Sequence, residues 1–187
     1  NWCFNCPSMV ATLSGAAVSD ALEDGRVVSG VGGQYNFVAQ AHEMADARSI
    51  LMLRSHRVVD GEVRSSIVKN YGHITIPRHL RDIFITEYGI ADLRGKNDSD
   101  IIKALLNVSD SRCQEELRLW AVSNGKLSAD YVIPKAYTNN TPEALAERLQ
   151  PFMQHLPSFP FGTDFTKDEL SIIKALQSLK SSTEHPL

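Results

Sequence analysis

The feature that most constrains the fold is a glycine-rich loop between a short β-branched run and a helical segment. Residues 26–29 read Arg-Val-Val-Ser, and residues 30–33 read Gly-Val-Gly-Gly. Phe37, Val38 and Ala41 then recur at helical spacing, so the sequence predicts a strand, a loop and a helix in succession. Backbone N–H groups in such a loop can converge on an anion or on the oxyanion of a reaction intermediate. A tight turn that binds nothing is the alternative interpretation.

Three further segments predict strands. Ser49–Leu53 and Asp82–Thr86 are continuous apolar runs, which suit strands covered on both faces, as in a parallel sheet. Glu62–Val68 alternates polar and apolar residues and follows a turn at Asp60-Gly61. Because helical segments separate the strands, the sequence predicts an α/β domain.

The periodicity changes after residue 97, where apolar residues recur at helical spacing. Four helices are predicted: one capped by Asp98 or Ser99, one ending at Asn124-Gly125, one from Thr141 to about Gln150, and one over Thr166–Leu179 capped by Thr166 or Asp164. We therefore expect two parts. An α/β domain covers residues 1–125, and a helical C-terminal extension over residues 126–187 packs on it.

Composition excludes several classes of protein. The 187 residues carry a net charge of −3 and a pI near 6.1, which argues against general binding to nucleic acid. The mean hydropathy of −0.18 and the lack of a long uncharged apolar run predict no membrane-spanning helix. Three cysteines fit a reducing cytoplasm better than a disulfide-stabilised secreted domain. The chain starts at Asn1 rather than Met, which we interpret as a sign of a longer polypeptide.

A charged segment follows the run that ends at Thr86. Residues 87–95 read Glu-Tyr-Gly-Ile-Ala-Asp-Leu-Arg-Gly and would stand at the carboxyl end of a buried strand, where open α/β sheets bind ligands. Glu87 could act as a base or nucleophile, Asp92 as a hydrogen-bond acceptor, and Arg94 as a clamp for a carboxylate or phosphate. A turn held by an Asp92–Arg94 pair or by a Glu87–Arg pair is the alternative.

Two smaller clusters give weaker signals. Cys3 and Cys6 form a Cys-x-x-Cys pair that resembles half a zinc site, but the second half is missing, so no metal site is predicted. His73 and the basic run Arg78–Arg81 could meet a phosphate group or form a solvated turn.

Two of these segments, taken in order, resemble a known family. Residues 27–37, Val-Val-Ser-Gly-Val-Gly-Gly-Gln-Tyr-Asn-Phe, resemble the glycine motif of the acetyl-CoA hydrolase/transferase family, the class I CoA-transferases related to 4-hydroxybutyrate and succinyl-CoA:acetate CoA-transferases. Residues 86–95 resemble the C-terminal signature of that family. The resemblance covers about Asn5 to Leu117. It implies two similar α/β domains, of which this chain is the C-terminal one, and an open, mostly parallel sheet flanked by helices.

The resemblance also implies transfer of coenzyme A through a glutamyl-CoA thioester. A glutamate attacks the acyl-CoA. In the last step a small carboxylate takes up the CoA, or water releases it. The backbone N–H groups of Gly32 and Gly33 would stabilise the oxyanion. The family's nucleophilic glutamate stands upstream of this region, whereas Glu43 follows the glycine loop on a predicted helix. We therefore assign no nucleophile to this chain and expect the N-terminal domain of the same polypeptide to supply it.

The other residues of the two motifs are expected to contact the substrate or its CoA part. They are Gly30, Val31, Gln34, Asn36, Glu87, Tyr88, Gly89, Asp92 and Arg94. No permanently bound cofactor is expected, and self-association into a homodimer is one expected assembly, because a separated domain exposes apolar surface. A non-catalytic CoA-binding or regulatory module of the same fold is the alternative function. A nucleotide-phosphate enzyme is a weaker alternative, since the loop lacks a P-loop lysine.

Overall fold

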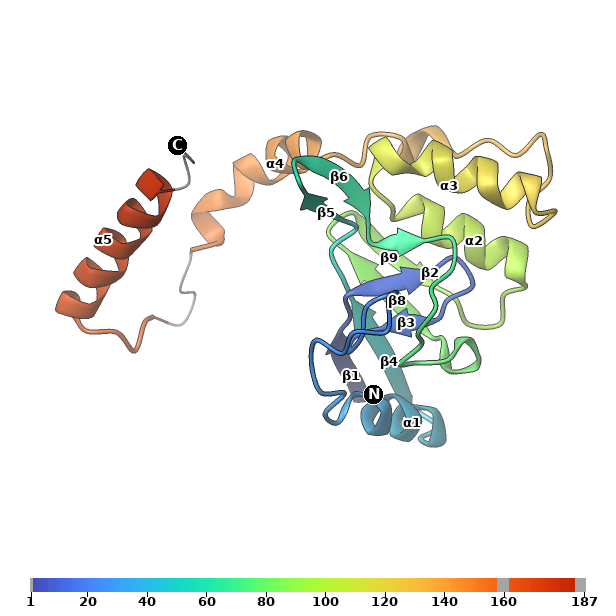
Figure 1. Cartoon of the computed structure of the whole chain (residues 1–187), viewed down its shortest axis with the longest axis horizontal. Helices are drawn as coiled ribbons and strands as arrows, with labels where there is room; N and C mark the ends of the chain where they lie inside the picture. The colour runs from blue at the N-terminus through green and yellow to red at the C-terminus, as the bar shows by residue number, and fades with distance from the viewer. Residues whose placement is uncertain (1, 158–161, 184–187) are drawn as a thin grey trace. The chain divides into compact units, whose positions relative to one another are not determined.

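The computed structural model describes residues 2–157 and 162–183 (Figure 1). The chain divides into two compact units, one up to Glu147 and one from Arg148 onward. The first unit contains all the strands and both segments that the sequence singles out. No helix among the described residues is both long and apolar enough to cross a membrane.

The main sheet confirms the predicted α/β class. Its strand order is β1 (Trp2–Pro7), β4 (Ala47–Met52), β8 (Ile83–Thr86) and β9 (Gly89–Asp92). The first three strands run parallel, and β9 returns antiparallel to β8 at the edge. The sheet is therefore mostly parallel, and the carboxyl ends of β1, β4 and β8 share one edge.

Two smaller sheets complete the β structure of the first unit. One has the order β3 (Ala17–Val18), β2 (Val10–Thr12) and β7 (Ile67–Val68). The other is a hairpin of β5 (His56–Val59) and β6 (Glu62–Ser65). Its turn is the predicted Asp60-Gly61, where both residues have positive φ, 53° and 78°. That conformation matches the right-handed twist of a two-residue hairpin.

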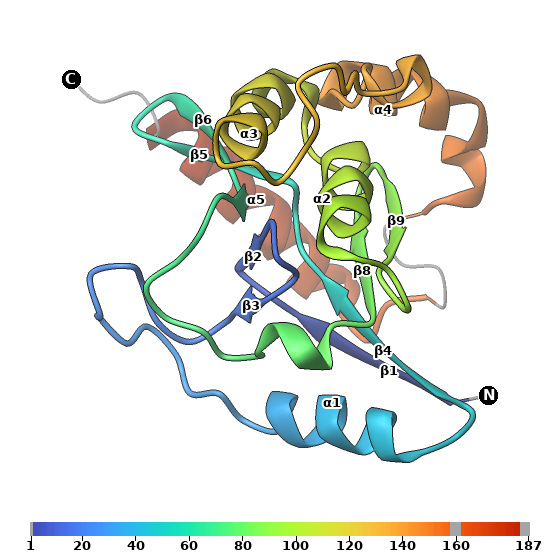
Figure 2. The same ribbon diagram turned by 90° about the vertical axis from the view of Figure 1, so that its right-hand side faces the viewer.

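Helices cover the main sheet on different sides (Figure 2). Helix α1 (Gln34–Glu43) packs on β1 and β4 through the buried Val38 and Ala41. Helix α2 (Asp98–Asn107) packs on β9 and on α3 (Ser111–Ser123), and its buried residues are Ile101, Ile102, Leu105 and Leu106. The helix predicted after residue 97 is confirmed, although its cap is Asn97, whose side chain accepts a hydrogen bond from the Asp100 N–H, rather than Asp98 or Ser99.

The strand expected over residues 26–29 does not form. Val27 makes only an isolated bridge to Ala21, and the side chains of Val27 and Val28 are 70% and 48% exposed. The backbone N–H groups of Val28 and Ser29 instead donate to the carbonyl of Asp20. β-Branched residues favour a strand only where a neighbouring strand accepts their hydrogen bonds and packs on their side chains. The glycine loop therefore follows an exposed extended arm.

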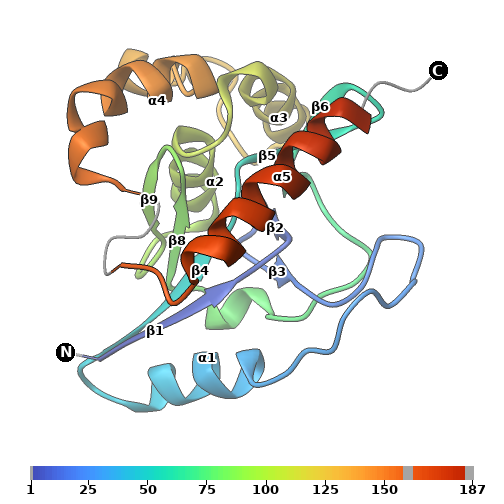
Figure 3. The ribbon, with the colours of Figure 1, turned by 90° about the vertical axis from the view of Figure 1, so that its left-hand side faces the viewer.

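The remaining helices are close to their predicted positions. Helix α4 (Pro142–Leu149) starts after Thr141, whose hydroxyl accepts a hydrogen bond from the Ala144 N–H. Helix α5 (Lys167–Thr183) is one uninterrupted helix (Figure 3), and Thr166 and Glu169 cap its start reciprocally. The described residues also form three short 3₁₀ helices, η1 (Arg78–Leu80), η2 (Lys135–Tyr137) and η3 (Gln150–His155).

The division of the chain falls later than the boundary expected after residue 125. Leu127 and Ile133 belong to the core of the first unit, together with Phe84 and Ala91 from the sheet. The first unit consequently extends to Glu147. Packing of the C-terminal extension on the α/β domain stays a prediction.

Candidate active site at the carboxyl edge of the sheet

Both segments that the sequence singles out reach the same edge of the main sheet. Gln34, which directly follows the glycine loop, is bonded to the end of β1, and Glu87 follows β8 directly. β4 lies between these two strands and ends at Met52. Open α/β sheets bind ligands outside the carboxyl ends of their strands, so this edge is the candidate site.

The glycine loop is anchored at both of its ends. At its start, the Val28 and Ser29 N–H groups donate to the Asp20 carbonyl at 2.8 and 3.2 Å. At its end, the Gln34 side-chain Nε2 donates to the Pro7 carbonyl at 3.0 Å. These contacts hold the loop on either side of residues 30–33, and the carbonyls of Val31 and Gly33 accept hydrogen bonds from the Gln34 and Phe37 N–H groups at 3.4 and 3.0 Å.

The backbone N–H groups of residues 30–33 remain unpaired. Within the described part of the chain, none of these four groups donates a hydrogen bond. Gly33 is the N-cap of α1, and Gly32 has φ +58°, so the loop leads directly into a helix N-terminus. Helix N-termini favour negative charge, because their first N–H groups have no partner within the helix. The loop is consequently suited to hold an anion or a developing oxyanion.

A pocket of about 340 Å³ lies against the loop. Its lining includes Cys6, Ser29, Gly30, Val31, Gln34 and Phe37. Burial raises the pKa of the Cys6 thiol, which disfavours the thiolate that a nucleophile requires. The chemistry available to this pocket from the described residues is therefore that of backbone amides, not of a side-chain nucleophile.

Gly30 and Gly32 differ in whether their backbone conformation requires glycine. Gly32 needs a left-handed backbone, whereas an alanine Cβ at Gly30 would meet no atom within 4 Å and no strain. We expect Gly32→Ala to lower the free energy of unfolding by about 1–2 kcal/mol, and Gly30→Ala to change it by less than about 0.5 kcal/mol. Urea unfolding of both variants measures this difference. Equal losses of unfolding free energy in the two variants would contradict a left-handed backbone at Gly32.

At the second segment, neighbouring groups hold the Glu87 carboxylate in place. Its two oxygens accept hydrogen bonds from the Ser55 backbone N–H and hydroxyl, both at 2.8 Å. The His56 Nδ1 lies 3.4 Å from the same carboxylate, and the Glu87 side chain is 24% exposed. The Glu87 carboxylate therefore has a fixed orientation at the carboxyl edge of the sheet, because both of its oxygens accept hydrogen bonds.

A buried aspartate, Asp110, contacts the same His56 side chain that lies beside Glu87. Asp110 is fully buried, and its carboxylate accepts two hydrogen bonds from the Arg112 guanidinium at 2.8 Å and one from the Tyr88 hydroxyl at 3.0 Å. The His56 Nδ1 lies 3.2 Å from it. Burial alone would raise the pKa of Asp110, but the hydrogen bonds from Arg112 and Tyr88 outweigh burial and lower the pKa. Burial and then the bond to Asp110 raise the pKa of the Tyr88 hydroxyl.

A second pocket of about 540 Å³ opens beside Glu87. Its lining includes Arg54, Arg57, Val58, Tyr88 and Leu145, so it lies between the β5 segment, the β8–β9 turn and α4. His56 also lines it, although no motif in the sequence marks His56 or Asp110 as a site residue. Asp110 could be predicted only as a helix cap, because the contacts with His56 and Tyr88 cross between distant segments.

The predicted Glu87–Arg94 cluster is divided by the fold. Glu87 and Tyr88 form the turn at the carboxyl edge, and Gly89 begins β9. Since β9 runs antiparallel, it carries Asp92 to the opposite end of β8, roughly 10 Å along the strand from Gly89. There Asp92 pairs with the Arg94 guanidinium at 2.6 and 2.9 Å, which lowers the pKa of Asp92 to about 2. Asp92 and Arg94 therefore hold a turn away from this edge, and their contact with the ligand stays a prediction.

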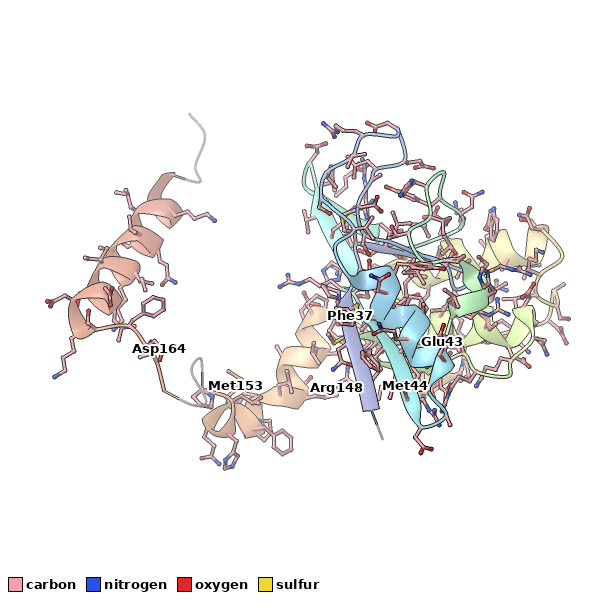
Figure 4. All side chains as sticks on the ribbon, turned by 90° about the horizontal axis from the view of Figure 1, so that it is seen from below. Phe37, Glu43, Met44, Arg148, Met153 and Asp164 are labelled. Carbon is pink, nitrogen blue, oxygen red and sulfur yellow. The ribbon has the colours of Figure 1, made fainter. Side chains whose placement is uncertain are left out.

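Of the other residues considered from the sequence, one lies at the carboxyl edge of the sheet and two lie on the surface of α1. Gln34 is buried and lines the smaller pocket, whereas Asn36 is exposed on α1. Glu43 is exposed at the C-terminal end of α1, at the far end of the helix from Phe37 near the loop (Figure 4). That Glu43 is not the nucleophile stays a prediction. No group of three or more potential metal ligands occurs among the described residues.

Comparisons with known proteins match this region of the chain. The family described as the acetyl-CoA hydrolase/transferase C-terminal domain matches residues 4–121, more than half of the chain. A "Probable butyrate:acetyl-CoA coenzyme A-transferase" of Syntrophomonas wolfei is 33% identical over 109 residues, which cover 53% of this chain and 24% of that protein. A "4-hydroxybutyrate coenzyme A transferase" of Clostridium kluyveri is 30% identical over 92 residues, 48% of this chain and 21% of that protein. The matched region thus spans about a quarter of these relatives.

Solved structures show the same fold. A mutant of the protein RipA superposes with a TM-score of 0.61 and 26% identity, covering 66% of this chain and 28% of that chain. RipA from Yersinia pestis gives a TM-score of 0.56 at 24% identity, covering 66% of this chain and 26% of that chain. A 4-hydroxybutyrate CoA-transferase from Porphyromonas gingivalis gives 0.52 at 21% identity, covering 65% and 26%.

Proposed function

Since this chain belongs to the acetyl-CoA hydrolase/transferase family through the C-terminal domain of that family, we propose that it forms one wall of an active site for CoA transfer. The reaction moves CoA from an acyl-CoA to a small carboxylate, or, in a hydrolase, water cleaves the thioester and CoA leaves as the free thiol. The observation that carries this proposal is the run of four unpaired backbone N–H groups at residues 30–33. Gly30 and Val31 of this run line a pocket at the carboxyl edge of the sheet.

The proposed reaction runs through two covalent intermediates. A glutamate outside this chain attacks the thioester carbonyl; its oxygen bonds to the acyl carbon, and the C–S bond breaks to give an acyl-glutamyl anhydride and CoA thiolate. The thiolate then attacks the glutamyl carbonyl, which forms a glutamyl-CoA thioester and releases the acyl group as a carboxylate. An acceptor carboxylate repeats these steps in reverse, or water hydrolyses the thioester. Every step passes through a tetrahedral carbon that carries a negatively charged oxygen.

The glycine loop is suited to stabilise that oxygen. A carboxylate is a weak nucleophile in water, so the site needs hydrogen-bond donors that are already oriented and a water-poor surrounding. The N–H groups of Gly32 and Gly33 provide such donors without losing any internal bond. Val31, Tyr35 and Phe37 leave apolar surface exposed beside the loop, at 40%, 46% and 48%, and the N-terminal domain would cover it and exclude water.

The Glu87 network has a positioning role in this proposal. Glu87 and Tyr88 stand at the same sheet edge as the loop, and Ser55 and His56 fix the direction of the Glu87 carboxylate. An oriented carboxylate there can accept hydrogen bonds from the CoA part of the substrate. Asp92 and Arg94 are not part of this network, because they pair with each other away from this edge.

Reconstitution tests the proposed function. The chain alone is expected to show no thioester cleavage with acetyl-CoA or butyryl-CoA, because it lacks the nucleophilic glutamate. Co-expression with the N-terminal region of its polypeptide should restore CoA transfer, and a glutamate-to-glutamine change in that region should abolish it. Thioester release by the isolated chain, or no turnover by the complete polypeptide, would contradict the proposal. The second result would favour a non-catalytic CoA-binding module.

A further inference from the structure

The start of the glycine loop is held by two neighbouring residues, Ser19 and Asp20. The Asp20 carbonyl accepts the Val28 and Ser29 N–H groups at 2.8 and 3.2 Å. The Ser19 carbonyl accepts the Ser29 hydroxyl at 3.0 Å. Ser19 and Ser29 also line the pocket beside the loop. A shift of residues 19 and 20 would therefore move the start of the loop and one wall of its pocket.

A side chain from a distant segment fixes these two residues. Next to them, the two segments are joined by the backbone, because the Ala17 carbonyl accepts the Thr75 and Ile76 N–H groups at 2.9 and 3.0 Å. Further along the chain, the Thr75 hydroxyl accepts the Ser19 N–H at 2.9 Å and donates to the Asp20 carboxylate. A single hydroxyl therefore ties both of the residues that hold the loop to this segment.

The Asp20 carboxylate needs these bonds because it is buried. Asp20 is 8% exposed, and a carboxylate that is removed from water has to be paired or hydrogen-bonded. The His73 Nε2 lies 3.0 Å from the same oxygen that accepts the Thr75 hydroxyl. The hydrogen bonds from Thr75 and His73 hold the pKa of the Asp20 carboxyl below its usual range, although burial opposes them. These contacts orient residue 20, and with it the carbonyl that holds the loop.

The loop itself makes few contacts that hold it in place. The N–H groups of residues 30–33 donate no hydrogen bond within the described part of the chain. A Cβ atom added at Gly30 or Gly32 would meet no atom within 4 Å, so the backbone is not packed against other residues on that side. The position of the loop therefore depends on its two ends, and Asp20 holds the start. An oxyanion donor that is displaced by about 1 Å can lower a rate by about 100-fold.

We propose that Thr75 and Asp20 are positioning residues for the glycine loop: the Thr75 hydroxyl orients Asp20, and the Asp20 carbonyl orients the N–H groups of residues 30–33. This inference rests on the proposed function, because it takes those N–H groups to be the oxyanion donors. Neither residue belongs to the lining of the pocket beside the loop, so each acts through the loop and not on the substrate. No motif in the sequence marks either of them, because their contact joins residues 55 positions apart.

Hydrogen exchange of the whole chain tests the contact of Thr75 with the loop anchor. Thr75→Val keeps the branched shape of the side chain and removes the hydroxyl with both of its bonds. We expect the Val28 and Ser29 N–H groups to exchange about 10-fold faster in this variant, because the residue that accepts their hydrogen bonds is less firmly held. Thr75→Ser keeps the hydroxyl and should restore the exchange rates of the wild type.

Thr12→Val is the matched control. The Thr12 hydroxyl also makes two hydrogen bonds, within the turn at the opposite end of the β2–β3 hairpin. This variant should lower the stability of the chain without changing exchange at Val28 and Ser29. It therefore separates a general loss of stability from a loss of the loop anchor.

Kinetics of the complete polypeptide test the role of the anchor in the reaction. Thr75→Val is expected to lower kcat by about 10- to 100-fold and to change the KM for acyl-CoA by less than about threefold, because a displaced oxyanion donor is missed mainly in the transition state. Thr75→Ser should keep kcat within about threefold of the wild type, and so should Thr12→Val.

The outcomes separate this inference from the proposed function. Faster exchange at Val28 and Ser29 together with a lower kcat, in Thr75→Val but not in Thr12→Val, supports the inference. Unchanged exchange at these two N–H groups overturns it, and so do equal effects of the two variants. Faster exchange with unchanged kcat also overturns it, if Gly33→Pro lowers kcat and the proposed function stands. If neither Thr75→Val nor Gly33→Pro changed kcat, the oxyanion role in the proposed function would fail, and the positioning role with it.

Discussion

Replacing Gly33 by proline in the complete polypeptide is expected to lower kcat for CoA transfer by about 10²- to 10³-fold, the usual effect of losing one oxyanion donor. Proline removes the N–H of residue 33, and this N–H takes part in no hydrogen bond within the described chain. The backbone at Gly33 has φ −89°, near the range that proline adopts. At this N-cap position the carbonyl accepts the hydrogen bond of the Phe37 N–H, which proline preserves. The KM for acyl-CoA should change far less than kcat, because the bond is made mainly in the transition state.

Gly33→Ala is the control for this result. An alanine Cβ would meet the Phe37 ring at 3.1 Å, as the proline Cβ would, but alanine keeps the N–H. Phe37 is 48% exposed and can move, so both variants should fold. Steady-state kinetics with equal circular-dichroism spectra would make the comparison. If alanine and proline lowered kcat equally, the loss would come from the added carbon, and the oxyanion role of residue 33 would be refuted.

The largest expected effect on stability belongs to Asp110→Asn. Asp110 is fully buried. Asparagine removes its negative charge, so Arg112 loses its ion-pair partner. Tyr88 and His56 then face a weaker hydrogen-bond acceptor. Arg112 is 39% exposed, so the charge left behind is partly solvated, and the lost charged hydrogen bonds cost about 1.5–3 kcal/mol, a fall in Tm of roughly 5–10 °C for a chain of this size. Thermal unfolding followed by circular dichroism measures this.

Asp92→Asn is a matched control, because Asp92 binds Arg94 through the same pattern of side-chain and backbone bonds. Asp92 is 42% exposed, so its loss should cost less than about 1 kcal/mol. The pKa of Asp110 is lowered in the folded chain, so its contribution is fully present above the unfolded value of about 3.9 and is lost as pH falls through the folded value. The difference between wild type and Asp110→Asn should therefore shrink below about pH 4. Equal effects of the two variants at pH 7 would contradict the role of burial.

The strands and helices whose formation depends on nearby residues in the sequence could be predicted from the sequence. The runs at 49–53 and 82–86 became β4 and β8, because buried apolar residues in parallel strands leave a continuous signal. Helices α2 to α5 followed from apolar spacing and caps. Residues 26–29 had the same β propensity but found no neighbouring strand, since strand formation depends on a partner that the segment itself does not contain.

The candidate site was only half predictable for the same reason. The glycine loop carries its own signal in residues 30–33, and the structure places it at the sheet edge. His56 and Asp110 carry no such signal, because their roles come from contacts with Glu87 and Tyr88 that the fold creates. The sequence also could not show that the chain reverses at Glu87-Tyr88 and so separates Asp92 from Glu87.

The most direct test is the crystal structure of the complete polypeptide with a trapped glutamyl-CoA thioester. The account predicts that the thioester oxygen lies about 2.7–3.1 Å from the backbone nitrogens of Gly32 and Gly33. An oxygen that faced water or a side chain, with those two nitrogens more than about 4 Å away, would contradict it.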